Sequence, residues 1–327
     1  MKEDLNHDIF MLVDGSAIVH RAYHAIPNFT RGDGVPTGAV HGFFQMVFKM
    51  IENLRPAHIA IAFDRPKPTF RQLMYAGYQA QRPKMESELS GQFKIIIEIL
   101  EKANICTYAV DGYEADDIIG TLAYEAVRGN RKSDGSIAYI VTGDRDMLQL
   151  VNDRVKVMAP VKGISEVTIF DADKVREKYG INPSQFVDLK GLMGDSSDNY
   201  PGVAGVGPKT AAILINSYGS IEDIYKNLGE IALKKKGLAE KLVSGAEAAA
   251  LAKTLAKILT DVPFSHDFSD MDFKKIDVGG LRSALEKYEF KTLPKRVDEV
   301  FNKGIGDSVK GKVDSEKKKK MEQMKLI

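Results

Sequence analysis

The sequence predicts an α/β fold built on a mostly parallel sheet, and three apolar runs carry this prediction. The runs lie at 9–15, 58–64 and 138–144, are rich in β-branched residues, and each closes with an aspartate. Apolar and polar positions do not alternate within them, which is typical of parallel strands that are buried on both faces. Helical patterns separate the runs, as the crossovers of a parallel sheet require.

Three helices are predicted between and after these strands, at 38–54, 87–103 and 115–128. Crossovers of this kind bring the carboxyl ends of all strands to one edge, where open α/β sheets bind their ligands. Asp14, Asp64 and Asp144 should therefore converge. An aspartate also commonly starts a turn after a strand, but the same residue after three strands favours a functional site.

Composition limits the classes of protein to consider. The 327 residues are 44% hydrophobic and 28% charged, enough for a core and for two domains. The single cysteine, Cys106, excludes an internal disulfide framework and a cysteine zinc cluster, and fits a reducing cytoplasm. No run approaches the roughly 20 apolar residues of a membrane span, so we expect a cytoplasmic protein without membrane partners. A net charge of +1 permits nucleic-acid binding only through local basic clusters.

Further acids fall at the same predicted edge of the sheet. They occur in YEADD at the start of a helix, in TGDRD after a strand, and in GDSSDN at 194–199. Helix capping accounts for one or two of them, but not for the whole set. The candidate metal ligands are Asp14, Asp64, Glu114, Asp116, Asp117, Asp144, Asp146, Asp195 and Asp198.

Such a set needs counter-charge, because carboxylates a few ångströms apart raise one another's pKa. Oxygen ligands without cysteine or clustered histidine favour Mg²⁺ or Mn²⁺. The number of acids predicts two ions roughly 3.5–4 Å apart, the arrangement that hydrolyses phosphodiesters.

The stretch GVAGVGPKTA at 202–211 superficially matches a phosphate-binding P-loop. Pro208 separates the glycine from Lys209, however, and no apolar strand precedes the loop, so the required context is absent. The pattern favours a helix–hairpin–helix that contacts duplex phosphates through its backbone, and a simple turn is the alternative. The candidate DNA contacts are Gly202, Gly205, Gly207, Lys209 and Thr210.

The segment at 65–84 interleaves basic and aromatic side chains, a composition that suits single-stranded nucleic acid. A solvated surface loop is the alternative. The residues are Arg65, Lys67, Phe70, Arg71, Tyr75, Tyr78, Arg82 and Lys84.

Past the glycine loop, 233–264 predicts two helices with lysines at 234–236, which form either a solvated face or a contact to downstream duplex. From Lys303 onward, the glycine, lysine and serine content predicts a disordered tail or linker whose lysines could add nonspecific DNA affinity.

Taken together, MLVDGS, AFD, GYEADD, TGDRD, GDSSDNYPGV and GVGPKTA, in this order, resemble a bacterial 5′ nuclease of the flap-endonuclease superfamily. They are similar to the N-terminal 5′→3′ exonuclease domain of bacterial DNA polymerase I. The resemblance implies a PIN-like α/β catalytic domain at 1–190 with a helical arch at about 65–95. It also implies a helix–hairpin–helix (helix–three-turn–helix) domain at 191–290, followed by a tail or linker at 291–327.

The resemblance also implies roles for the acids. Asp14, Asp64, Glu114 and Asp116 match the first metal site, Asp144, Asp146 and Asp198 match the second with Asp116 able to bridge, and Asp117 and Asp195 match further bacterial acids. In the arch, Arg71 and Arg82 match basic positions. Gln79 departs from the Tyr-Lys-Ala-x-Arg pattern of the relatives, because this chain reads YQAQR, which predicts weaker engagement of phosphate.

The predicted function is therefore a structure-specific 5′→3′ exonuclease and 5′-flap endonuclease in DNA replication and repair. We expect two Mg²⁺ or Mn²⁺ ions, K⁺ at the hairpin loop, and a monomer acting on DNA with a 5′ single-stranded end or flap and adjoining duplex. A PIN-type ribonuclease and a non-catalytic DNA-binding protein are the alternatives. Whether the chain is a stand-alone nuclease or the front of a polymerase stays open.

Overall fold

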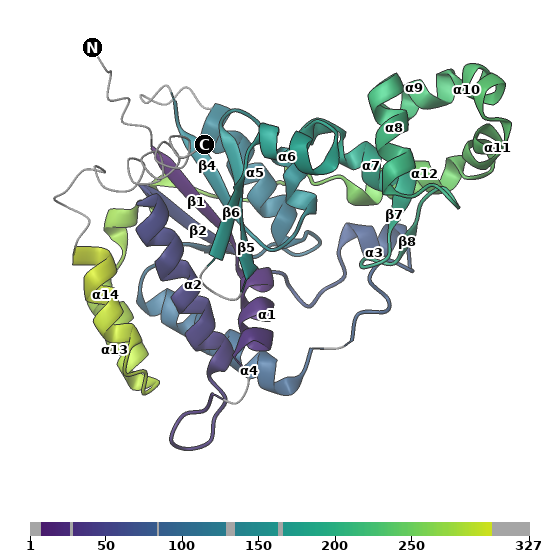
Figure 1. Cartoon of the computed structure of the whole chain (residues 1–327). Helices are drawn as coiled ribbons and strands as arrows, with labels where there is room; N and C mark the ends of the chain where they lie inside the picture. Colours follow the sequence, from purple (N-terminus) through teal and green to yellow (C-terminus); the bar gives the residue numbers. More distant parts are fainter. Residues whose placement is uncertain (1–7, 27–28, 84, 129–134, 163–165, 303–327) are drawn as a thin grey trace, which may run out of the picture.

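The computed structural model describes residues 8–26, 29–83, 85–128, 135–162 and 166–302 (Figure 1). A six-stranded sheet of order β3-β2-β1-β4-β5-β6 forms its centre. The strands are β1 (Ile9–Asp14), β2 (His58–Ala62), β3 (Thr107–Tyr108), β4 (Ile137–Val141), β5 (Val155–Lys162) and β6 (Glu166–Phe170). All neighbours pair in parallel except β6, which is antiparallel to β5. The three strands that the apolar runs predicted are confirmed.

Both faces of β1 are buried, which explains its unbroken apolar sequence. Met11 and Val13 belong to one hydrophobic core, whereas Phe10 and Leu12 belong to another. The first core includes α1 (Gly15–Ala25), α2 (Gly38–Leu54) and α4 (Ser87–Lys102), and the second includes α5 (Ala115–Arg128). The predicted helices at 38–54 and 115–128 form as expected, and the third ends one residue early.

Between β2 and α4 the chain leaves the sheet. It forms the short helix α3 (Phe70–Met74) and a series of turns, and Figure 1 places α3 beside the hairpin of β7 and β8. The described part of the predicted arch at about 65–95 therefore contains α3, a series of turns and the first turns of α4.

A helical module follows the sheet and projects to one side of it (Figure 1). Its elements are α6 (Ala172–Tyr179), α7 (Phe186–Met193), β7 (Gly194–Asp195), β8 (Tyr200–Pro201), α8 (Pro208–Tyr218), α9 (Ile221–Lys226), α10 (Leu228–Lys234), α11 (Lys236–Ser244) and α12 (Ala246–Ala256). Helices α11 and α12 are the two that the sequence predicts over 233–264. The predicted fold class, a mostly parallel sheet flanked by helices with a second helical module, is confirmed.

The carboxyl end of the described chain differs from the expected tail. Helices α13 (Val278–Lys287) and α14 (Leu293–Asn302) pack on the outer side of α2 and α4 (Figure 1). Helix α14 forms because Leu293, Val297 and Val300 are spaced along one helical face and are buried in the core. Residues 303–327 lie outside the described residues.

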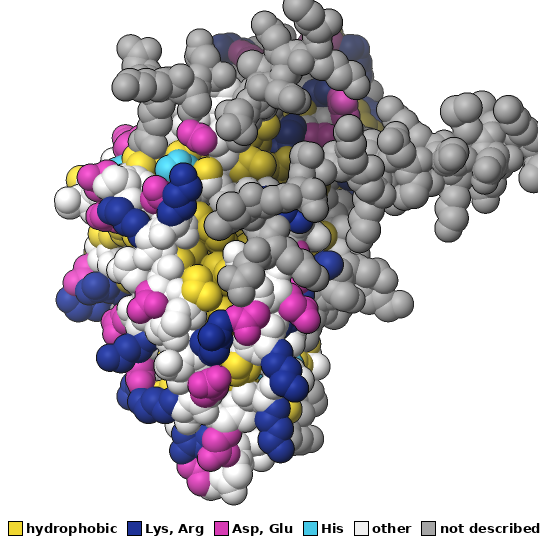
Figure 2. Space-filling model, turned by 90° about the vertical axis from the view of Figure 1, so that its left-hand side faces the viewer, with side chains coloured by type: hydrophobic (Ala, Val, Ile, Leu, Met, Phe, Trp, Pro, Cys, Tyr) yellow, Lys and Arg dark blue, Asp and Glu magenta, His cyan; other side chains and the backbone are white. Residues whose placement is uncertain are grey.

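The face that carries α13 and α14 shows acidic and basic side chains interspersed (Figure 2). A polyanion needs a local excess of positive charge, so this face is a poor candidate for DNA binding. No helix within the described ranges is both long and apolar enough to cross a membrane.

The chain that leaves α12 crosses α5 and fastens it to the helical module. The amide of Leu259 donates to Asp117, and the amide of Val262 donates to the Thr121 hydroxyl. Gly120 lies directly under this crossing, because a Cβ there would come within 2.6 Å of the Leu259 carbonyl oxygen. Backbone thus packs on backbone next to the acids at the start of α5.

We expect Gly120→Ala to destabilise the protein by about 1–3 kcal/mol, because the added methyl group meets a carbonyl oxygen that cannot move freely. Gly91→Ala in α4 is the matched control, since a Cβ at Gly91 meets nothing within 4 Å. That control should gain up to about 1 kcal/mol from helix propensity. Urea unfolding of both variants measures the difference, and equal stabilisation of the two would contradict the close packing at Gly120.

Candidate active site

A cleft of about 520 Å³ opens at the carboxyl edge of the strands. The sheet edge, the first turn of α5, the segment 78–85 and the residues at the end of α12 surround it. Seven predicted acids line this single cleft, namely Asp14, Asp64, Glu114, Asp116, Asp144, Asp146 and Asp198. The structure therefore brings together residues that are far apart in the sequence.

Backbone amides orient the acids that follow β1 and β2. Asp14 caps α1, with Oδ1 accepting from the Ala17 amide at 2.9 Å and Oδ2 accepting from the Thr142 hydroxyl at 2.7 Å. Asp64 Oδ1 accepts from the Ala115 amide at 2.8 Å, at the start of α5. Both carboxylates thus accept from an amide in the first turn of a helix, and the same contact holds each of them at the cleft.

The acids after β4 are oriented by a tight turn. The Asp144 amide donates to the Thr142 hydroxyl at 2.9 Å, and the Asp146 amide donates to Asp144 Oδ1 at 2.8 Å. Asp146 also begins a short 3-10 helix, Asp146–Leu150. The turn therefore directs two carboxylates from three consecutive residues towards the cleft.

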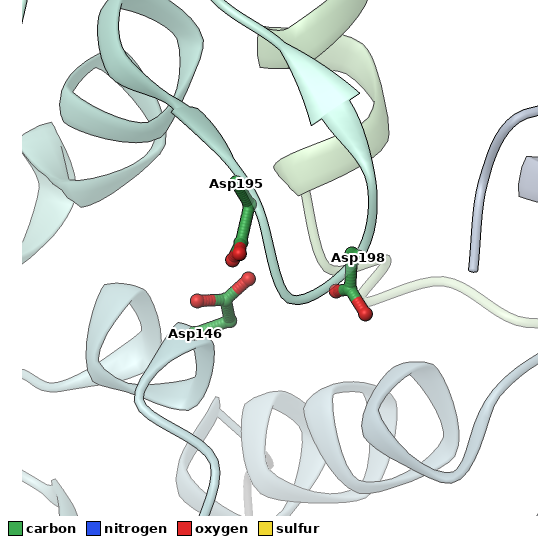
Figure 3. A group of neighbouring side chains, drawn as sticks. All are labelled: Asp146, Asp195 and Asp198. Carbon is green, nitrogen blue, oxygen red and sulfur yellow. The ribbon is translucent and has the colours of Figure 1, made fainter. Parts of the chain in front are cut away.

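Asp146, Asp195 and Asp198 form a three-carboxylate cluster, in which one oxygen of each residue lies within 4.8 Å of the other two. Asp195 and Asp198 come from the β7–β8 hairpin, and Figure 3 shows the Asp195 and Asp146 carboxylates facing each other. Oxygen donors at this spacing suit a hard divalent cation. The remaining acids line the same cleft as Asp146 and Asp198 and supply the same kind of donor.

Burial makes this group of carboxylates costly to ionise without a cation. It raises the pKa of Asp14, Glu114 and Asp146 to about 7. Burial and the neighbouring Asp144 raise the pKa of Asp116 well above its usual range. The donor set and the raised pKa values both fit divalent metal ions, whose charge would offset the repulsion.

Lys190 on α7 is a site residue that the sequence analysis missed. Its Nζ lies 2.5 Å from Asp146 Oδ1 and pairs with Asp195 Oδ2 as well. Burial opposes the lysine charge, but these two carboxylates raise its pKa above the usual range. The lysine precedes Asp195 by five residues, and a pairing at this spacing depends on the chain reversal after α7.

Arg71 and Asp117, predicted as a DNA contact and a metal ligand, are bound to each other in the structure. They form a bidentate ion pair with distances of 2.7 and 2.8 Å, with Arg71 2% exposed and Asp117 fully buried. Arg71 also donates to Glu114 and to the carbonyl oxygens of Leu255 and Lys257. Both Asp117 oxygens accept from Arg71. A buried guanidinium is stable only when its donors have partners, and these contacts supply them.

The segment that follows α3 docks onto the three-carboxylate cluster. Arg82 Nη2 lies 2.6 Å from Asp198 Oδ1, and Gln79 Nε2 donates to the same oxygen at 3.1 Å. The Tyr78 hydroxyl donates to Glu114 Oε2 at 3.2 Å. Arg82 remains about half exposed, so it faces both the cluster and the solvent. Lys84 lies outside the described residues.

The glycine loop is anchored by Val203 and Val206, both of which are buried. Gly205, Gly207 and Lys209 are exposed beside the start of α8, and Thr210 is half-buried. Gly202 differs from these, because a Cβ on it would lie 2.3 Å from the Gly194 amide nitrogen. The close approach of two backbones thus explains this glycine.

The raised pKa values predict how the metal-free protein responds to pH. A carboxyl whose folded pKa lies above its unfolded value stabilises the fold at low pH, and this contribution is lost as pH rises through the folded pKa. Metal-free stability should therefore fall between about pH 4 and pH 7, by about 1.4 kcal/mol per pH unit for each carboxyl that titrates. Thermal unfolding in EDTA measures this slope.

Asp116→Asn should flatten that profile, because it removes one buried carboxyl. His20 and His41, whose pKa values are lowered by burial, act in the opposite direction and are unchanged in this variant. A metal-free melting temperature that rises over the same range would contradict the assignment.

Two family models match consecutive parts of the chain. The N-terminal resolvase-like domain of 5′-3′ exonuclease matches residues 9–180, and its C-terminal SAM fold matches residues 181–279. The chain is similar to DNA polymerase I of Bacillus subtilis, with 40% identity over 289 residues that make up 88% of this chain and 32% of that protein. DNA polymerase I of Lactococcus lactis subsp. lactis is 42% identical over 278 residues, 83% of this chain and 31% of that protein. The chain thus spans about a third of the length of these relatives.

Solved structures agree in fold. The 5′-exonuclease of T5 with bound divalent zinc ions is 19% identical with a TM-score of 0.60, and the match covers 90% of this chain and 99% of that one. The catalytic core of Rad2 in complex with DNA substrate is 18% identical with a TM-score of 0.56, covering 91% and 93%. The family models match most of the chain across both its sheet and its helical module, and the chain therefore belongs to the 5′-3′ exonuclease family, as its motifs predicted.

Proposed function

We propose that this chain is a metal-dependent 5′→3′ exonuclease and 5′-flap endonuclease that hydrolyses DNA phosphodiesters. The observation that carries the proposal is the convergence of seven carboxylates on one cleft, bordered by the segment with Tyr78 and Arg82. A carboxylate set of this size has little use other than to hold metal ions. Two solved relatives in fold, one with bound divalent ions and one with a DNA substrate, support the same assignment.

Two Mg²⁺ or Mn²⁺ ions would be held by two groups of acids. The first group is Asp14, Asp64, Glu114 and Asp116, and the second is Asp144, Asp146, Asp195 and Asp198. When bound, such a pair of ions activates a water and stabilises the leaving 3′ oxygen. The chain's own contribution is to hold the carboxylates of Asp14 and Asp64 in place through the Ala17 and Ala115 amides.

The DNA would lie on two surfaces. The exposed backbone of Gly205 and Gly207 and the start of α8 suit phosphates of the duplex, with Lys209 adding positive charge. The segment with Arg82 and Lys84 suits the 5′ single strand. A K⁺ ion at the hairpin loop, a monomeric state, a cytoplasmic location, a role in replication and repair, and the domain boundaries at 190 and 290 belong to the same proposal.

A PIN-type ribonuclease is the second candidate, because it would share the acidic α/β core. It would not need the helical module with its exposed glycine loop. Cleavage of a 5′-flap DNA, compared with a matched RNA flap and labelled at each end, distinguishes the two. A protein that binds the flap in Mg²⁺ but cuts neither substrate would be a non-catalytic binding protein.

Asp144→Asn tests the metal chemistry. The change keeps an oxygen that can accept from the Asp146 amide but removes one negative charge from the cleft. We expect single-turnover flap cleavage in Mg²⁺ to fall by at least about 100-fold, while DNA binding is retained because phosphate contacts lie elsewhere. Asp153→Asn, at an exposed position outside the cleft, is the control. Near-normal cleavage by Asp144→Asn would refute the proposed metal site.

Lys209→Ala tests the duplex contact. We expect weaker binding of duplex DNA and a salt slope lower by about one unit, because one phosphate contact is lost. Lys226→Ala is the matched control, since this exposed lysine of the same module pairs with Asp223. Fluorescence anisotropy over a salt series measures both. Identical slopes for the two variants would remove Lys209 from the interface.

A further inference from the structure

The Lys190 ammonium pairs with two members of the three-carboxylate cluster, Asp146 and Asp195. It contacts an oxygen of Asp146 at 2.5 Å and an oxygen of Asp195, and the three side chains are 12%, 14% and 9% exposed, respectively. A cation of the chain itself therefore neutralises part of the cluster. Lysine is well suited to this place, because it is a compact point charge on a flexible stem.

The local backbone fixes this arrangement. Helix α7 ends at Met193, its C-cap residue Gly194 has a φ of +71°, and the reversal brings Asp195 back towards Lys190 in the last turn of the helix. Asp195 Oδ1 accepts from the Ser197 amide at 2.7 Å, which leaves Oδ2 for the lysine. Lys190 and a divalent ion in the cluster would therefore compete for the same two carboxylates.

A nearby group offers the ammonium a second position. The Tyr179 hydroxyl is buried and has no hydrogen-bond partner among the described residues. Burial raises the pKa of Tyr179, and the charges of Arg145, Lys190 and Asp146 act on it as well. A phenol oxygen can accept a hydrogen bond from an ammonium.

We propose that Lys190 is the resident counter-cation of the three-carboxylate cluster, that an entering divalent ion displaces its ammonium from Asp146 and Asp195, and that Tyr179 accepts the displaced ammonium. This inference rests on the proposed two-ion function and adds a regulation of its second site. The metal-free fold gains stability from the lysine, and the second ion binds less tightly because it must compete. Negative charge from a DNA phosphate then favours loading of the ion together with the substrate.

Arg82 is a different case, although it pairs with Asp198 of the same cluster. Its side chain is about half exposed and comes from the segment that borders the cleft, so it can leave with that segment. Lys190 belongs to a helix that packs closely on α12. The helix is held in place, so the Lys190 ammonium can move only by a change of its side-chain conformation. Once displaced, it therefore needs a second partner nearby.

The test is a Mn²⁺ titration without DNA, followed by the electron paramagnetic resonance of free Mn²⁺. The binding step that Asp195→Asn weakens is assigned to the cluster. We expect Lys190→Met to tighten this step by about tenfold, a small part of what a unit charge at contact distance can contribute. Lys253→Met is the matched control, because that lysine pairs with Asp188 and Glu222 in the same module. It should leave the step unchanged.

Tyr179→Phe separates displacement from simple charge balance. We expect it to weaken the same step in the wild-type background and to have no effect in the Lys190→Met background. Metal-free thermal unfolding in EDTA gives an independent readout, in which Lys190→Met melts lower than Lys253→Met and recovers when Mn²⁺ is added. If Lys190→Met does not fold without metal, Lys190→Gln in the same titration replaces it.

An unchanged or weaker Mn²⁺ step in Lys190→Met and in Lys190→Gln would overturn the competition. An equal effect of Tyr179→Phe in both backgrounds would overturn the role of Tyr179. A wild-type protein that binds no Mn²⁺ at the cluster, together with no flap cleavage, would instead overturn the proposed two-ion function. The two failures are therefore distinguishable.

Discussion

Repulsion among the carboxylates at the carboxyl edge of the sheet is the constraint on which the rest of the site depends. Seven acids line one cleft, and burial raises the pKa of several of them to about 7. Such a group persists in a folded chain only when donors and cations offset its charge. Backbone amides accordingly hold Asp14, Asp64 and Asp144, Arg71 pairs with Glu114, and Lys190 pairs with Asp146.

The buried pair of Arg71 and Asp117 shows how this compensation also joins the parts of the molecule. Arg71 comes from α3, Asp117 from α5, and the carbonyl oxygens that complete the arginine shell come from the end of α12. Removing one partner would leave an uncompensated buried charge, which is far more costly than losing the pair as a whole. The sheet and the helical module are thus connected next to the acids Glu114 and Asp116.

The three-carboxylate cluster joins three separate segments of the chain. Asp198 belongs to the hairpin of β7 and β8, and Lys190 belongs to α7. Arg82 and Gln79 belong to the segment that borders the cleft. Asn199 strengthens this contact by donating to the Gly77 carbonyl oxygen at 2.7 Å. A change of charge at the cluster therefore alters contacts to two parts of the chain. One is the segment proposed to bind the single strand, and the other is the module proposed to bind the duplex.

The sequence by itself determined the strands of the central sheet, the helices at 38–54 and 115–128, the family, and the convergence of the main acids. These follow from local patterns, because apolar runs report burial and the carboxyl ends of parallel strands must share one edge. Tertiary structure alone decided that Arg71 and Asp117 satisfy each other, that Lys190 enters the cluster, and that 293–302 forms a helix. The reason is that these outcomes depend on which distant groups come into contact, as when Arg71 meets a carbonyl oxygen 184 residues away. Charge balance in a buried site is a property of the assembled neighbourhood, and no spacing within one segment encodes it.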